Sequence, residues 1–168
     1  GFHGNRLFCG SDGGIYVSDN GGTNFTDLTA GVQISQFYKI AVSKQSATNM
    51  VGGLQDNGGH AYSGSQWKNY YGADGMDTAI NPTNQNQYYG FIQYGNSLYI
   101  SNNAGNSNSG SVSSPGGVNG NWVTPLLANS VGELFSGFGG LYKLVGANWE
   151  LQNVDGLITD QKEEILSL

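Results

Sequence analysis

The sequence predicts an all-β protein, and three observations favour that class. Glycine accounts for 28 of the 168 residues, about twice the usual share. Only 11% of the residues are charged, while ten Tyr, seven Phe and three Trp are spread along the whole length. Many short strands joined by tight turns need such a composition, whereas helices need Ala, Leu, Glu and Lys.

The first element is a hairpin within residues 10–25. A strand is expected at Ile15–Ser18, followed by a tight turn at Asn20–Gly22 and a return strand opened by Phe25. Asn-Gly is a strong hairpin signal, because the central residues of this turn type need positive φ angles. The hairpin contains the pattern Ser-x-Asn-x-Gly-x-x-Phe, formed by Ser18, Asn20, Gly22 and Phe25.

The hairpin belongs to a repeat. A turn of small residues followed by a Tyr-centred strand recurs about 37 to 46 residues apart, and another strand precedes each copy. A further aromatic residue follows each copy and is expected to open the next strand. The central tyrosines are Tyr16, Tyr62, Tyr99 and Tyr142, and the following aromatics are Phe25, Trp67, Trp122 and Trp149. This period matches the blades of a β-propeller, each of which is a four-stranded antiparallel sheet.

The remaining strands follow from apolar runs between turn residues. Those before the tyrosines are expected at Arg6–Gly10, Asn49–Leu54, Tyr88–Ile92 and Glu133–Ser136. Innermost strands are expected at Phe37–Val42 and Gly75–Ile80, and Val123–Leu127 is expected to start the last blade.

We therefore expect residues 1–168 to form a single propeller segment. It would have two complete blades, at 37–71 and 76–123, and two partial blades, at 5–30 and 124–153. Residues 102–121 consist almost wholly of Asn, Ser, Gly and Pro, which predicts a mobile loop insertion. Because partial blades leave open sheet edges, the segment is expected to pair with the rest of a longer propeller.

Composition and motifs also exclude several function classes. The formal net charge is −6 and no basic run occurs, so nucleic acid is not an expected partner. No apolar run approaches the ~20 residues of a membrane span. The single Cys9 excludes an internal disulfide. No cofactor motif and no metal-binding spacing occurs, so neither a cofactor nor a metal is expected.

Two motifs resemble known families. The hairpin pattern resembles the Asp-box of bacterial-neuraminidase repeats, with Asn20 and Phe25 in place of Asp and Trp. The stretches Val51–Gly59 and Gly72–Pro82 resemble those of secreted sortilin-like propellers of Bacteroidetes-type bacteria. The resemblance implies a seven- or eight-bladed or tandem propeller that is secreted or at the cell surface. We assign the Asp-box residues a structural role in the hairpin.

Three carboxylates are candidates for catalysis. A propeller-type glycoside hydrolase needs two carboxylates facing one cleft, and Asp56, Asp74 and Asp77 form the plausible set. The alternative is that they cap turns, as Asp-Asn-Gly and Ala-Asp-Gly sequences commonly do. A sialidase is excluded for these residues, because its three-arginine cluster cannot be built from the single Arg6.

Exposed aromatic residues are the candidates for binding. Trp67, Tyr70, Tyr71 and Tyr94 could stack on sugar rings, or alternatively pack between blades. The leading hypothesis is a non-catalytic extracellular module for binding, adhesion or assembly, with a polysaccharide or another surface protein as partner. The alternative is a polysaccharide-degrading hydrolase that uses the paired Asp residues.

Overall fold

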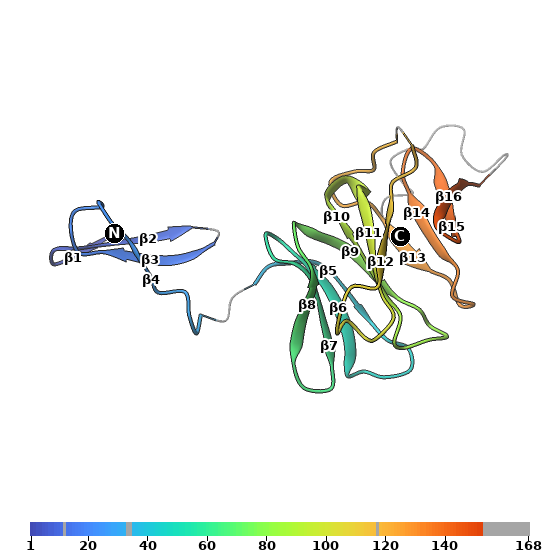
Figure 1. The fold of residues 1–168 in the computed structure, drawn as a ribbon, viewed down its shortest axis with the longest axis horizontal. Helices are drawn as coiled ribbons and strands as arrows, with labels where there is room; N and C mark the ends of the chain where they lie inside the picture. Colours follow the sequence, from blue (N-terminus) through green and yellow to red (C-terminus); the bar gives the residue numbers. More distant parts are fainter. Residues whose placement is uncertain (12, 33–34, 117, 153–168) are drawn as a thin grey trace. The chain divides into compact units, whose positions relative to one another are not determined.

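The computed structural model describes residues 1–11, 13–32, 35–116 and 118–152. Within them the chain consists of β-strands, turns and one 3₁₀ turn, η1 at Gln93–Gly95. The predicted all-β class is confirmed. The chain divides into two compact units, Gly1–Ser35 and Gln36–Leu168, and Figure 1 shows the strands of each.

The first unit is a single small antiparallel sheet. Its strands follow the sequence order β1 Phe2–His3, β2 Arg6–Ser11, β3 Gly14–Ser18 and β4 Thr26–Asp27. Among the described residues of this unit, Val17 is the one hydrophobic side chain that is buried. The unit therefore has almost no core of its own.

The second unit contains three four-stranded antiparallel sheets, each also in sequence order. The second sheet of the chain has β5 Phe37–Val42, β6 Asn49–Leu54, β7 Gly58–Ser63 and β8 Trp67–Tyr71. The third has β9 Gly75–Ile80, β10 Tyr88–Ile92, β11 Ser97–Ser101 and β12 Gly110–Ser113. The fourth has β13 Leu126–Ala128, β14 Leu134–Gly137, β15 Leu141–Val145 and β16 Asn148–Leu151.

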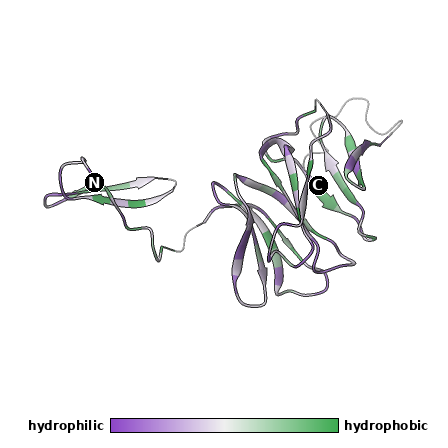
Figure 2. Ribbon diagram, in the orientation of Figure 1, coloured by the Kyte–Doolittle hydropathy of each residue, from purple (hydrophilic) through white to green (hydrophobic). Residues whose placement is uncertain are grey.

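These three sheets pack face to face, with the third in the middle. One buried cluster, which includes Val51, Tyr71 and Tyr88, joins the second and third sheets. Another, which includes Phe91 and Trp149, joins the third and fourth. The first strand of the third sheet, β9, contacts the first strands β5 and β13 of its neighbours. Figure 2 shows that hydrophobic residues concentrate along the strands, while most loops are hydrophilic.

Glycine allows the closest approach between the sheets. A Cβ on Gly53 in β6 would overlap the carbonyl oxygen of Met76 in β9. Only glycine lets the two backbones lie this close, which explains part of the high glycine content.

Two details differ from the prediction. The first and fourth sheets each have four strands, so the end blades are more complete than expected, although β1 and β4 have only two residues each. The predicted insertion 102–121 contains β12, which pairs with β11. The outer strand of the third sheet is therefore β12 and does not start at Trp122. An outer strand pairs with a neighbour along one edge only and needs little apolar surface. In β12 the buried Val112 alone supplies this apolar surface.

Candidate functional site

Three aromatic side chains from separate parts of the second unit meet in one cluster. Tyr38 lies in β5, Tyr94 in η1, and Trp122 in the loop before β13. The indole Nε1 of Trp122 donates a hydrogen bond of 3.3 Å to the Tyr38 hydroxyl. The rings of Tyr94 and Trp122 contact edge to face, with centroids 5.1 Å apart. Tyr94 and Trp122 remain 44% and 41% exposed, so this aromatic cluster offers ring surface to a ligand.

The backbone holds the aromatic cluster in place. The Tyr94 amide donates to the Trp122 carbonyl at 3.2 Å, and the Gly120 amide donates to the Tyr94 carbonyl at 2.9 Å. Tyr94 has a φ of 60°, a left-handed conformation that is costly for a bulky residue and is often found at functional sites. Beside it, the Oε1 atom of Gln93 is buried and has no hydrogen-bond partner among the residues that the structure describes.

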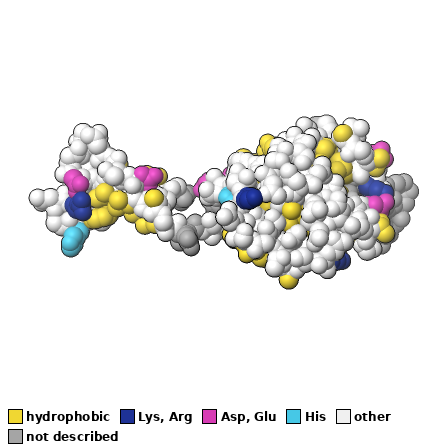
Figure 3. Space-filling view, turned by 60° about the horizontal axis from the view of Figure 1, so that its bottom comes forward, with side chains coloured by type: hydrophobic (Ala, Val, Ile, Leu, Met, Phe, Trp, Pro, Cys, Tyr) yellow, Lys and Arg dark blue, Asp and Glu magenta, His cyan; other side chains and the backbone are white. Residues whose placement is uncertain are grey.

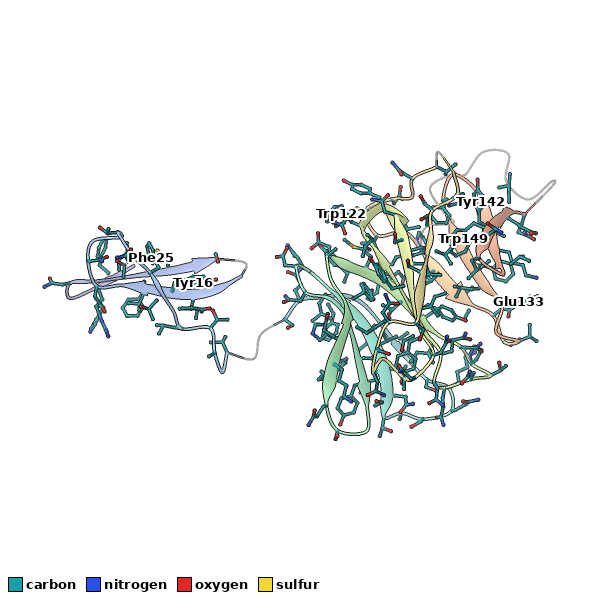
Figure 4. The ribbon with its side chains drawn as sticks, viewed as in Figure 1. Tyr16, Phe25, Trp122, Glu133, Tyr142 and Trp149 are labelled. Carbon is teal, nitrogen blue, oxygen red and sulfur yellow. The ribbon has the colours of Figure 1, made fainter. Side chains whose placement is uncertain are left out.

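The aromatic cluster lies at one end of the three sheets of the second unit. This is the end at which the first strand of each sheet begins. Trp122 precedes β13 there, and the β6–β7 and β10–β11 connections lie at this end because neighbouring strands are antiparallel. Of the four described non-glycine residues with positive φ, Asp56 and Tyr94 lie in these two connections, and Ala73 lies in the β8–β9 connection at the same end. Figure 4 shows Trp122 at this end of the unit and Glu133 at the opposite end.

Two of the predicted carboxylates bond to backbone amides. The Oδ1 atom of Asp74 accepts the Asp56 amide at 2.7 Å, which ties the entry of β9 to the β6–β7 turn. The two oxygens of Asp77 accept the amides of Thr78 and Leu126 at 2.8 and 3.1 Å. Burial raises the pKa of Asp77, although these two hydrogen bonds and nearby Lys39 oppose the rise. The arrangement gives Asp77 a role in joining β9 to β13.

The predicted sugar-stacking residues fall into two groups. Trp67 and Tyr94 are exposed, at 43% and 44%, and the Trp67 ring lies 5.5 Å from those of Phe37 and Tyr62. Tyr70 and Tyr71, by contrast, lie in the core, at 6% and 4% exposure, so for these two the alternative of packing between blades holds and the surface platform does not.

A β-bulge buries both of these tyrosines. The register of β7 against β8 shifts between Gly59 and His60, and Tyr70 is the extra residue on β8. A bulge turns two successive side chains toward the same face. The rings of Tyr70 and Tyr71 accordingly meet edge to face at 4.8 Å.

The sequence reasoning missed Tyr38 and Trp122 as members of a site. Trp122 was expected only to open a strand. One signal that could have indicated them is their position near the first strand of a sheet: Tyr38 is the second residue of β5, Trp122 lies four residues before β13, and Asp74 immediately precedes β9.

The Asp-box-like residues shape their own hairpin. The Ser18 hydroxyl accepts the amides of Asn20 and Gly22 at 3.3 and 2.8 Å, and the Asn20 side-chain oxygen accepts the Asn24 amide at 3.0 Å. Phe25 follows and is 46% exposed. These contacts stay within the hairpin and indicate a structural role.

Charged side chains are sparse around the second unit, as Figure 3 shows for one face. Among the described residues no group of three His, Cys, Asp or Glu side chains is placed to hold a metal ion. Within the same residues no helix is long and apolar enough to cross a membrane.

Comparison with protein-family models and with curated proteins found no match. Solved structures do match. The chain is similar to a GH74 enzyme from Niastella koreensis, with 18% sequence identity and a TM-score of 0.52, over 82% of this chain and 21% of that one. It is also similar to an ancestral GH74 enzyme, with 14% identity and a TM-score of 0.51, over 87% and 24% of the two chains.

The fold is a β-propeller. At these identities the likeness shows the fold alone, and it agrees with the successive four-stranded antiparallel sheets. The chain spans about a fifth to a quarter of the length of the two GH74 enzymes. Membership of the Asp-box or sortilin-like proteins stays a prediction.

Proposed function

We propose that this chain is part of a longer, secreted or cell-surface propeller that binds polysaccharide without cleaving it. The aromatic cluster of Tyr38, Tyr94 and Trp122 carries the proposal. It brings half-exposed rings from three parts of the fold to one end of the sheets, and backbone hydrogen bonds hold two of them.

A sugar chain fits the chemistry of this cluster. The faces of Tyr and Trp rings are apolar, while the Tyr hydroxyl and the indole N–H are polar. A pyranose has the same mixture, with an apolar C–H face and hydroxyl groups around its edge. The low charge of the chain, 11% of its residues, favours a neutral ligand over an ionic one.

The alternative is a glycoside hydrolase, and two observations favour it. The two solved structures described above are GH74 enzymes. The raised pKa of Asp77 is the state that a general acid needs. Against it, both Asp77 oxygens already accept backbone amides, and Asp74 accepts the Asp56 amide. A carboxylate with these partners stabilises the fold and is poorly placed to transfer a proton.

Retention on immobilised neutral polysaccharides tests the proposal. We expect Trp122→Ala to weaken retention about tenfold, because a lost stacked ring costs ~1.4 kcal/mol. Trp67→Ala is the matched control, since Trp67 has the same side chain and a similar exposure but lies outside the cluster. Loss of retention with Trp67→Ala alone would move the site to the second sheet and contradict our assignment.

Release of reducing ends separates binding from hydrolysis. It is measured for this chain and for the longer protein in which we place it. We expect no release from either. Release that disappears in Asp74→Asn or Asp77→Asn would make the protein a hydrolase.

A further inference from the structure

The fourth sheet has one face in the core and one face that is exposed. Because side chains alternate along a strand, Leu126, Leu134 and Trp149 point toward the third sheet, where they are buried. The other set points away from the third sheet, and Leu127 in this set is 62% exposed. Cross-strand pairing brings the members of this set together. We call this outward side the end face, which includes Leu127, Phe135, Gly137, Leu141, Lys143 and Glu150.

The end face contains an apolar hollow over a glycine. The hollow has a volume of about 120 Å³ and lies at Gly137, among Pro125, Leu127, Phe135 and Leu141. A Cβ on Gly137 would lie 3.6 Å from Pro125, which is an ordinary contact, and the φ of Gly137 lies outside the left-handed region. Within the described residues, therefore, no contact of the fourth sheet requires a glycine here.

The second sheet has a glycine at the corresponding position, and there a strand of another sheet covers it. Val51 and Gly53 in β6 point toward the third sheet, as Phe135 and Gly137 in β14 point toward the end face. In each strand the glycine is the last residue of this set. Gly53 lies against Met76 in β9, whose carbonyl oxygen takes the space of a Cβ. Gly137 offers the same close approach to a first strand.

Chain order indicates which sheet would supply that strand. In the second unit, the sheet that covers a face is the one that follows next in the chain. The chain leaves the outer strand β8 and enters β9 through residues 72–74, and it leaves β12 and enters β13 through residues 114–125. A sheet that follows β16 in a longer protein would be the third case of this order.

We propose that the end face binds a further four-stranded antiparallel sheet of the same polypeptide, whose first strand lies over Gly137 as β9 lies over Gly53. The contact rests on the longer propeller proposed above, and it goes further by naming the face through which the chain joins the remaining blades. The apolar side chains of Leu127 and Leu141 would then pack against the new sheet, which removes them from water.

The charges of the end face are compatible with this partner. Lys143 pairs with Glu133, and its Nζ atom lies 6.0 Å from the centre of the Phe135 ring. Covering Lys143 therefore leaves no unpaired lysine in the contact. Glu150 lies on the outer strand β16 and is exposed, so it can stay in water at the edge of the contact.

A second copy of this chain is the competing occupant. It would have to bind from dilute solution and lose its translational freedom. A sheet in the same polypeptide is held close to the end face by its linker, which gives it a high effective concentration. Both of the sheet contacts in the second unit are of this second kind, within one chain.

Cysteine labelling tests the proposal. Leu127→Cys places a small apolar residue with a thiol on the end face. Val131→Cys is the matched control, since Val131 is 67% exposed but lies in the β13–β14 turn. Each variant is made in the 168-residue chain and in the longer protein encoded by the same gene. A maleimide is added at several protein concentrations, and mass spectrometry of peptides separates each thiol from Cys9.

We expect the thiol of Leu127→Cys to react about a hundredfold more slowly in the longer protein than in the dilute chain, because a covered thiol reacts only when the sheets separate. Val131→Cys should react equally fast in both. Equal labelling of Leu127→Cys in the two proteins would overturn the proposal, as would a gene that ends at Leu168. Protection that disappears on dilution would assign the end face to a second copy, and protection in the dilute chain would assign it to a segment of this chain. Either result would overturn the proposal.

Gly137→Val gives a second measurement, which needs no cysteine. Valine suits a strand, and its Cβ has room beside Pro125, so the urea midpoint of the 168-residue chain should not change. In the longer protein the added methyl groups would overlap the following sheet, and the midpoint should fall by about 0.5–1 M. An equal shift in both proteins, or no shift in the longer one, would contradict the contact.

Polysaccharide retention of the same proteins keeps the two proposals apart. A longer protein that protects Leu127→Cys but is not retained would overturn the binding function and support the contact at the end face. A longer protein that is retained but leaves Leu127→Cys reactive would overturn the contact alone.

Discussion

Asp77 shows how one residue can have a different role from the one its type indicates. The sequence makes it a candidate acid, because it lies near Asp74 at the start of an expected innermost strand. In the structure it is partly buried, and it bonds the amides of Thr78 and Leu126. Its carboxylate thus links β9 to β13, the first strands of two neighbouring sheets.

The raised pKa of Asp77 predicts a pH dependence of stability. The folded protein holds this proton more tightly than the unfolded chain, whose carboxyl has a pKa near 3.8. The stabilising contribution of this group is therefore complete below that value and is lost as the pH rises through the higher folded pKa. We expect the free energy of unfolding of the wild type, relative to Asp77→Asn, to fall as the pH rises above about 4.

Urea unfolding of both proteins across this pH range measures that difference. Asn keeps the size of the side chain and one acceptor oxygen, so both proteins should fold. An identical pH dependence for the two proteins would contradict the assignment of a raised pKa to Asp77.

At the scale of the element, the same turn occurs twice in different surroundings. The β11–β12 turn repeats the hydrogen bonds of the Asp-box-like hairpin: the Ser101 hydroxyl accepts the Gly105 amide at 2.9 Å, and Asn103 accepts the Ser107 amide at 3.0 Å. This copy also packs on the second sheet, where Lys68 bonds Asn106. The turn therefore joins two sheets as well as two strands.

Glycine at this turn should be sensitive to substitution. A Cβ on Gly105 would overlap that of Ala61 in β7, and its φ is 76°. Gly105→Ala should lower the free energy of unfolding by about 2–4 kcal/mol, from backbone strain and overpacking together. Gly64 is the matched control, because its φ is 90° and the space around it is open. Gly64→Ala should cost only about 1–2 kcal/mol.

Denaturant unfolding of the two variants gives the comparison. If Gly105→Ala and Gly64→Ala lower the free energy of unfolding equally, backbone strain alone accounts for the loss. The close contact of the turn with the second sheet would then make no contribution.

The sequence predicts strands well where local signals are strong. Phe37–Val42 and Tyr88–Ile92 were expected with the bounds they have, because apolar runs lie between turn residues. Prediction from the sequence fails where pairing with a neighbouring strand determines the structure. The burial of Tyr70 follows from a bulge in the register with β7, and β12 forms from a Gly- and Ser-rich stretch because β11 supplies its hydrogen bonds. The aromatic cluster likewise needs three distant segments to meet, which no local pattern shows.

At the scale of the whole molecule, the two compact units differ in how much apolar surface they bury. The first unit has 35 residues, Gly1–Ser35, and its exposed hydrophobic side chains include Phe2 at 76% and Phe25 at 46%. Chains below about 40 residues rarely stabilise a core unaided. The second unit has two buried clusters, with Phe91 and Leu98 fully buried.

We therefore expect hydrogen–deuterium exchange to separate the units. Amides of β2 and β3 should exchange in seconds to minutes, whereas those of β6 and β10 should be protected for hours, because they open only with the whole second unit. Mass spectrometry of peptides from the intact chain, at several protein concentrations, measures this. If the first unit is protected only at high concentration, association between chains covers its apolar side chains. Equal protection of both units in a dilute monomer would contradict the prediction. The result also bears on the longer propeller that we propose, because a poorly protected sheet with exposed Phe2 and Phe25 would gain most from a neighbouring blade.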